Sequence, residues 1–162
     1  MPQVVRALRR AANPESLEKS VDHLLEECRM VLPGVQALFG FQLIAVFNAP
    51  FFERLTDAQR EIHLAALVLV CLAVALLMAP AAYHRQAEPN LVSRQFVDYA
   101  GRLLMLAMMP LMLALTLDVY LIAHMILRGN VVPALIAGSL LTVFALLWFG
   151  IPLAMRTPRT RS

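Results

Sequence analysis

Four long blocks of hydrophobic residues, separated by short polar segments, dominate the pattern of the chain. They cover residues 30–49, 62–83, 103–127 and 131–154. A helix rises about 1.5 Å per residue, so about 20 apolar residues are needed to cross a bilayer core about 30 Å thick. Each block is long enough. The pattern predicts an all-α membrane protein, a four-transmembrane-helix bundle in one membrane domain over residues 30–154.

A helical periodicity precedes the first block. Asn13 and Pro14 are typical of a helix start, with asparagine as the cap and proline in the first turn. Apolar residues then recur on one helix face at Leu17, Val21, Leu24, Leu25 and Cys28. We therefore expect residues 1–29 to be a cytoplasmic segment with an amphipathic helix. Its acidic residues disfavour adhesion to anionic lipid, so we expect it to pack against the basic segment 85–102.

The connections between the blocks contain helix signals of their own. Thr56 and Gln59 have the spacing of a capping box, which predicts that the second helix begins near Thr56. Residues 128–130 form so short a turn that the third and fourth spans should be an antiparallel hairpin. Pro133 then lies near the start of the fourth helix, where proline is tolerated.

The composition agrees with a membrane protein. Hydrophobic residues make up 60% of the 162 residues, charged residues make up 15%, and the mean hydropathy is +0.68. Soluble domains have about 25% charged residues. These values exclude a disordered chain, a nucleic-acid-binding tail and a typical soluble enzyme.

The distribution of positive charge predicts the orientation. Eleven of the 14 Lys and Arg residues lie before the first span, between the second and third, or in the basic tail 155–162. The positive-inside rule then predicts an inner-membrane protein with both termini in the cytoplasm. We expect its partners to be the lipid bilayer and anionic lipid headgroups on the cytoplasmic side, and we expect no nucleic acid.

Asp118 is the only acidic residue well inside a predicted span. An ionised carboxylate there costs about 2.5–3.5 kcal/mol on insertion scales, so it should face the bundle or a wet cavity. It follows Ala114 by four positions, on a stripe of small residues that should face another helix. Gln42, Ser139 and Thr142 lie at matching depth. This group predicts either an ion or proton site or a structural carboxyl that joins three helices.

A second polar group lies at the predicted cytoplasmic end of the bundle. Glu26 and Arg29 precede the first span, and His84 and Arg85 follow the second. These residues lie at similar depth and can form an ion-pair cluster. Such a cluster suits either the proton entry point of a transporter or a purely structural role that fixes the orientation of the helices in the membrane.

The remaining polar and sulfur-containing residues give weaker signals. His63 and His124 lie near the outer ends of their spans, where we interpret them as interface residues rather than metal ligands. Cys71, at the depth of Asp118, and Cys28 are expected to be small packing residues. We find no nucleophile–base pair and no metal constellation, so we expect neither an enzyme nor a cofactor.

Several stretches resemble a bacterial family of small four-span membrane proteins of unknown function. The resemblance covers roughly residues 20–153 and is carried by residues 26–41 (EECRMVLPGVQALFGF), 55–57, 79–85 and 148–152. Some members carry the name sodium/proton antiporter, which implies ion exchange. In that family the position of Gln42 is usually aliphatic. The resemblance singles out a group of residues for testing: Glu26, Arg29, Pro33, Gln36, His84 and Arg85.

Two classes of function remain open at this point. The first is a small oligomeric transporter or channel linked to a cation or to protons, because four short helices enclose little pathway alone. The second is a non-catalytic accessory or assembly subunit of a larger membrane complex. Small residues spaced along the fourth span, Ala134, Gly138 and Thr142, suit packing within the bundle or between copies of the chain.

Overall fold

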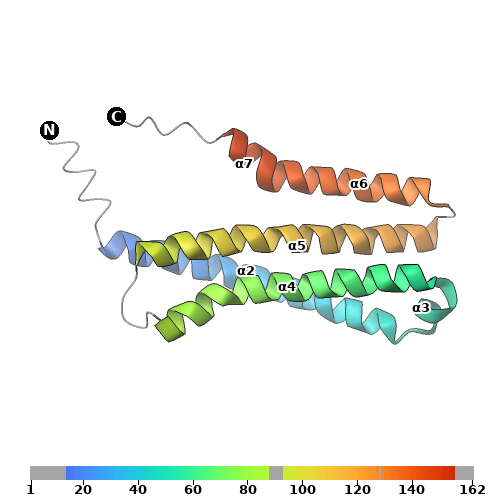
Figure 1. Cartoon of the computed structure of the whole chain (residues 1–162), viewed down its shortest axis with the longest axis horizontal. Coiled ribbons are helices and arrows are strands. Elements are labelled where there is room, and N and C mark those ends of the chain that lie inside the picture. The colour runs from blue at the N-terminus through green and yellow to red at the C-terminus, as the bar shows by residue number, and fades with distance from the viewer. Residues whose placement is uncertain (1–13, 88–92, 128, 156–162) are drawn as a thin grey trace. The chain divides into compact units, whose positions relative to one another are not determined.

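The computed structural model describes residues 14–87, 93–127 and 129–155, and the elements in these ranges are all helical (Figure 1). In chain order they are α2 (Pro14–Val46), α3 (Ala49–Arg54), α4 (Asp57–Ala87), α5 (Arg94–Ile126), α6 (Val131–Ala145), the π-helix η1 (Leu146–Gly150) and α7 (Ile151–Ala154). The predicted helix cap Asn13 and the tail residues 156–162 lie outside the described ranges.

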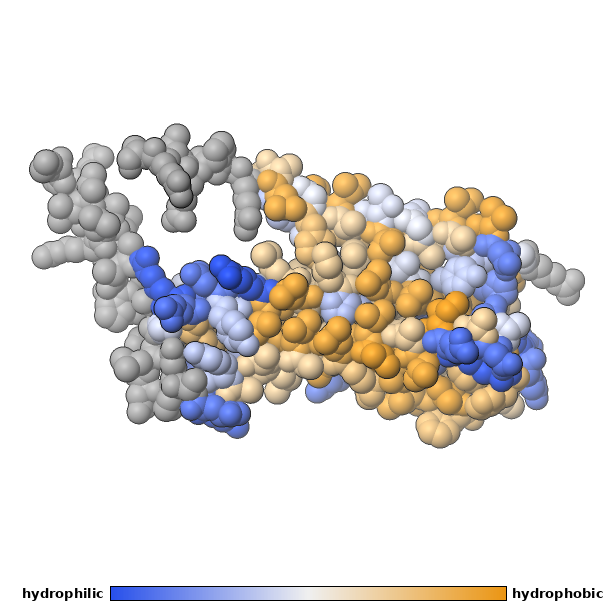
Figure 2. Space-filling model, in the orientation of Figure 1, coloured by the Kyte–Doolittle hydropathy of each residue, from blue (hydrophilic) through white to orange (hydrophobic). Residues whose placement is uncertain are grey.

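Four helical stretches are long and apolar enough to cross a membrane: Lys19–Val46, Asp57–Gln86, Arg94–Ile126 and Val131–Ala154. Hydrophobic residues predominate on the visible surface, as expected for helices that face lipid (Figure 2). In lipid every backbone polar group must be bonded internally, and a helix does this within one segment. The predicted all-α class with four membrane helices is therefore confirmed, and the chain is a multi-pass membrane protein.

The helices extend beyond the hydrophobic blocks from which they were predicted. The amphipathic segment and the first span form one helix, α2, of 33 residues, because no helix-breaking sequence separates Cys28 from Met30. Likewise α5 begins at Arg94, nine residues before the predicted boundary at 103. Hydropathy marks only the part of a helix that suits lipid, whereas the backbone hydrogen bonds continue into the polar flanks.

The chain divides into two compact units, each built from non-contiguous segments. Unit 1 comprises residues 1–38 and 72–107, and unit 2 comprises residues 39–71 and 108–162. Each of the long helices α2, α4 and α5 has one segment in unit 1 and another segment in unit 2.

The core of unit 1 joins α2 to the first turns of α5. Val21, Phe96 and Ala100 are each 2% exposed, and three partly buried residues pack against them: Leu24, Leu25 and Val97. This contact confirms that the amphipathic stretch packs against segment 85–102, through its apolar residues. Three acidic residues of that stretch, Asp22, Glu26 and Glu27, remain exposed.

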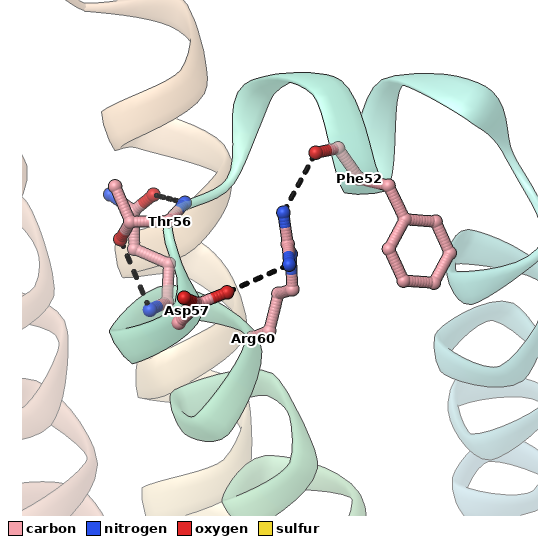
Figure 3. A network of polar contacts seen from close by, with 5 residues as sticks. Phe52, Thr56, Asp57 and Arg60 are labelled. Carbon is pink, nitrogen blue, oxygen red and sulfur yellow. Dashed lines mark hydrogen bonds and ion pairs between the residues drawn. The ribbon is translucent and has the colours of Figure 1, made fainter.

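In unit 2, the predicted capping box starts α4 (Figure 3). The backbone N–H of Gln59 donates to Oγ1 of Thr56 over 3.4 Å, and the backbone N–H of Thr56 donates to Oε1 of Gln59 over 3.0 Å. Arg60, one residue later, donates to Asp57 Oδ1 and to the carbonyl oxygen of Phe52, both over 2.8 Å. The Arg60 side chain therefore ties α3 to the first turn of α4.

The fourth span, also in unit 2, is the least covered helical stretch of the described chain. Within α6 only Pro133 and Ala137 are buried. The connection from α5 turns at Gly129, whose φ of +110° is strained for any residue with a Cβ. This turn permits the predicted hairpin, in which α6 runs back along α5 (Figure 1).

We predict that Thr56→Ala lowers the free energy of unfolding by about 1 kcal/mol, because it removes the oxygen that accepts from the N–H of Gln59. Thr56→Ser keeps this oxygen and should retain the stability of the wild type. Unfolding titrations in mixed micelles measure the free energy of unfolding of both variants. Equal stability of the alanine variant and the wild type would contradict a stabilising role of the cap.

Candidate functional site

Three polar side chains from three different helices meet in unit 2, two of them buried and one partly buried. Gln42 comes from the last turns of α2, His63 from the second turn of α4, and Asp118 from the last third of α5. Gln42 is 4% exposed and His63 7% exposed, and the side chain of Asp118 is 13% exposed. We call these residues the Gln42–His63–Asp118 cluster.

Hydrogen bonds fix the orientation of the amide and of the imidazole. Nε2 of Gln42 donates to Oδ2 of Asp118 over 2.7 Å. Nε2 of His63 lies 3.0 Å from the backbone carbonyl oxygen of Gln42. Because a carbonyl oxygen only accepts, this contact assigns a proton to Nε2 of the imidazole.

The assignment determines what His63 presents to Asp118. In the neutral imidazole, Nδ1 then carries a lone pair, and it lies 3.9 Å from Oδ1 of the carboxyl group. This distance is too long for a direct hydrogen bond. When both groups are deprotonated, two acceptors face each other, and a proton on either one or a small cation beside them relieves the repulsion. The neutral imidazole thus offers Oδ1 of Asp118 no hydrogen-bond donor.

The surroundings of the cluster supply few further donors. Oε1 of Gln42 is buried and accepts from no group among the described residues. The hydroxyl of Thr116, two residues before Asp118, donates to the carbonyl oxygen of Met112 in its own helix. Ala114, one turn before Asp118, is 0% exposed, which agrees with the predicted small-residue face. Oδ2 of Asp118 thus depends on the amide of Gln42.

The imidazole also rests on α3. The ring of Phe51, which is buried, meets the ring of His63 edge to face with 5.2 Å between the centroids. Phe51 packs on Phe52 in the same manner, and the guanidinium of Arg60 lies 5.3 Å from the Phe52 ring. Aromatic packing with Phe51 therefore attaches the ring of His63 to the short helix α3.

Of the predicted candidates, the structure brings Gln42 and Asp118 together but does not join Ser139 and Thr142 to them. Both hydroxyls are exposed and donate to carbonyl oxygens of α6, Ser139 to Ile136 and Thr142 to Gly138, each over 2.8 Å. A serine or threonine in a membrane helix can satisfy its hydroxyl within its own helix. Matching depth therefore did not imply contact for these two residues.

His63 is the member of the cluster that the sequence analysis missed. The second span was predicted to start at residue 62, which placed His63 at the membrane boundary. When residues were compared by their expected depth in the membrane, Cys71 was selected as the neighbour of Asp118 in this span, but Cys71 is exposed. The observed helix begins at Asp57, so His63 lies about 9 Å along it. Asp118 lies about 12 Å before the end of α5 at Ile126. The capping box at Thr56 already contained the signal for this longer helix.

The second predicted group lies in unit 1 and is only partly assembled. Arg29, His84 and Arg85 line one open groove, whereas Glu26 and Gln36 are exposed and do not line it. Among the described residues, no ion pair involves any member of this group. The predicted ion-pair cluster is thus replaced by a groove with cationic side chains.

Metal binding finds no support in the described part of the chain. In these ranges no group of three or more His, Cys, Asp or Glu side chains is placed to hold a metal ion. The cluster offers one carboxyl group, one imidazole and one amide, and these suit a proton or a weakly held cation better than a tightly bound transition metal.

The fold and the cluster define a class, a four-span membrane protein with a buried carboxyl–imidazole pair. Residues 11–152 match a family described as "Family of unknown function (DUF6328)", and the chain belongs to this family. No curated protein and no solved structure was found to match the chain.

We predict that Gln42→Leu costs about 1.5–3 kcal/mol in the wild type, because it removes the hydrogen bond to a buried carboxyl group. In an Asp118→Leu background the same change should cost much less, because neither partner is left unpaired. Unfolding titrations of the two single variants and the double variant measure the coupling. Gln36→Leu, at an exposed position of the same helix, is the matched control and should not destabilise.

If Gln42→Leu lowered the free energy of unfolding equally in the wild type and in Asp118→Leu, the double-mutant cycle would show that the amide contributes nothing through Asp118.

Proposed function

We propose that this protein is a transporter or channel linked to protons or to a small cation, and that Asp118 binds the transported charge. The observation that supports the proposal is the placement of Oδ1 of Asp118 3.9 Å from Nδ1 of His63, while Nε2 of His63 contacts a backbone carbonyl. Such a pair gains and loses one positive charge without a change of fold. The proposed activity is transport rather than catalysis.

A structural carboxyl group would be expected to have more complete hydrogen bonding. Asp118 has one direct donor among the described residues, the amide of Gln42, and no direct donor contacts Oδ1. A carboxyl group that joins helices only for stability gains most when each oxygen accepts from a donor. An oxygen without a donor instead suits a group that binds and releases a proton or a cation.

The cellular setting forms part of the proposal. The concentration of Lys and Arg before the first span, between the second and third, and after the fourth supports an inner (cytoplasmic) membrane location with both termini inside. Transport then runs between the cytoplasm and the opposite side. Several copies of the chain together would enclose a larger pathway than one four-span chain alone.

Flux through reconstituted vesicles tests the proposal. We predict that the purified full-length chain, in vesicles loaded with a pH-sensitive dye, accelerates the decay of a pH step in Na⁺, K⁺ or choline buffer. Asp118→Asn should reduce the rate by about tenfold or more, equivalent to about 1.4 kcal/mol in the barrier, because an amide cannot bind the charge. His63→Gln should also reduce it.

Asp98→Asn is the matched control, because it makes the same change at an exposed position of α5. It should transport like the wild type. Helical circular dichroism and gel filtration establish that each variant is inserted and folded. Wild-type flux in Asp118→Asn, or no flux above empty vesicles for the wild type in all three buffers, would overturn the proposal.

An accessory or assembly subunit is the second candidate, and the exposure of α6 favours it. Only Pro133 and Ala137 are buried in this helix, while the small residues Ala134 and Gly138 are exposed. A membrane helix with uncovered small residues allows the backbone of another helix to approach closely. This face suits a fixed protein partner or another copy of the chain.

The mass of the gently solubilised native particle separates the two candidates. For a transporter we predict a particle that contains several copies of this chain and no constant second protein. A second protein at fixed stoichiometry would support the accessory role instead. Native mass spectrometry identifies every component, and Gly138→Leu should reduce the assembly in either case if α6 forms the interface.

A further inference from the structure

Unit 1 contains an open groove of about 730 Å³ between α2 and α4. Arg29 and Arg85 contribute guanidinium groups to it, and His84 contributes an imidazole. Its apolar wall includes Leu32, Leu77 and Met78. The groove lies wholly within unit 1, and no residue of the Gln42–His63–Asp118 cluster lines it.

The cations of the groove have no anionic partner in the described protein. No acidic residue lines the groove, and in the described ranges neither Arg29 nor Arg85 forms an ion pair. Glu26, one turn before Arg29, is exposed and does not line the groove. Two arginine side chains that line one groove without a carboxylate suit the binding of a phosphate group, which each guanidinium can contact with two N–H donors.

Each wall of the groove carries an arginine and continues into apolar residues. Along α2 the lining runs from Leu25 and Cys28 past Arg29 to Leu32, and along α4 it runs backward from Gln86 and Arg85 to Leu77. Past Arg29 on one wall and His84 on the other, the lining toward the middle of the spanning helices is therefore apolar. A ligand that fits both the arginines and this apolar stretch carries a negative headgroup and a hydrocarbon chain.

Aromatic contacts hold the polar end in place. The ring of His84 meets the ring of Phe96 edge to face at 5.4 Å, and Tyr83 stacks on the same Phe96 ring at 5.8 Å. Tyr83 also contacts Tyr99, and these two tyrosines are 40% and 43% exposed. Half-exposed tyrosines are typical of the level of the lipid headgroups. Because Tyr83 directly precedes His84, the cationic residues of the groove lie near this level.

We propose that this groove binds one anionic phospholipid, with its phosphate between Arg29 and Arg85 and an acyl chain along Leu32, Leu77 and Met78. His84 contributes a further hydrogen-bond donor to the headgroup. Basic pockets between membrane helices are known to bind anionic headgroups. A free phosphate ion would use only the cationic end, whereas a lipid uses both walls. The inference does not depend on the proposed transport activity.

Native mass spectrometry of the full-length chain in detergent tests this inference. The protein is titrated with phosphatidylglycerol and with phosphatidylcholine of the same acyl chains. We expect phosphatidylglycerol to bind about tenfold more tightly or better, equivalent to about 1.4 kcal/mol. Arg29→Gln/Arg85→Gln should reduce its binding to the level of phosphatidylcholine.

Arg94→Gln/Arg102→Gln is the matched control, since it removes the same charge from exposed positions of α5 that do not line the groove. It should keep the preference for phosphatidylglycerol. An equal loss in both double variants would show attraction by net charge alone and would overturn the site. So would the absence of any preference in the wild type.

Two further measurements separate loss of the site from misfolding and lipid binding from the binding of free phosphate. Ala82→Phe keeps every charge but fills the groove from an exposed lining position, and it should weaken phosphatidylglycerol binding at unchanged helix content. Unchanged lipid binding in this variant would contradict the proposal. Inorganic phosphate should not displace the lipid at equal concentration, because it lacks the hydrocarbon chain. Displacement at equal concentration would assign the groove to free phosphate.

Discussion

The carboxyl group of Asp118 imposes the strictest constraint on this structure. It lies within a membrane-spanning helix, where an ionised group without partners costs several kcal/mol. The amide of Gln42 supplies the direct donor, and the imidazole of His63 supplies a neighbour that can carry a proton. Segments of α2, α4 and α5 must therefore keep one register within unit 2, because a slip of one residue turns each side chain by about 100° around its helix axis.

The register depends in turn on features at the outer ends of these helices. The capping box of Thr56 and Gln59 fixes where α4 begins, and Arg60 attaches α3 to that start. Because α3 carries Phe51, the same contacts support the ring of His63. Local hydrogen bonds in a short connection thus position a side chain about two turns deeper in the membrane segment.

Much of this arrangement was predictable from the sequence, because membrane spans and helix caps have local signatures. The four spans, the start of α4 and the place of Asp118 inside a span all follow from short stretches of sequence. The partners of Asp118 depend on tertiary contacts, and depth matching alone found Gln42 but selected Cys71 in place of His63. Ser139 and Thr142 show the limit of depth matching, because a hydroxyl can bond a carbonyl of its own helix.

The surroundings of Asp118 cannot be treated apart from those of His63. The backbone carbonyl oxygen of Gln42 contacts Nε2 of the imidazole, so Nδ1 is the ring nitrogen that lies near the carboxyl group, 3.9 Å from Oδ1. Gln42 contacts both members, one through its side chain and the other through its backbone. A change in the position of α2 would therefore alter both contacts at once, so the side chain of Asp118 and the ring of His63 depend on the same residue of α2.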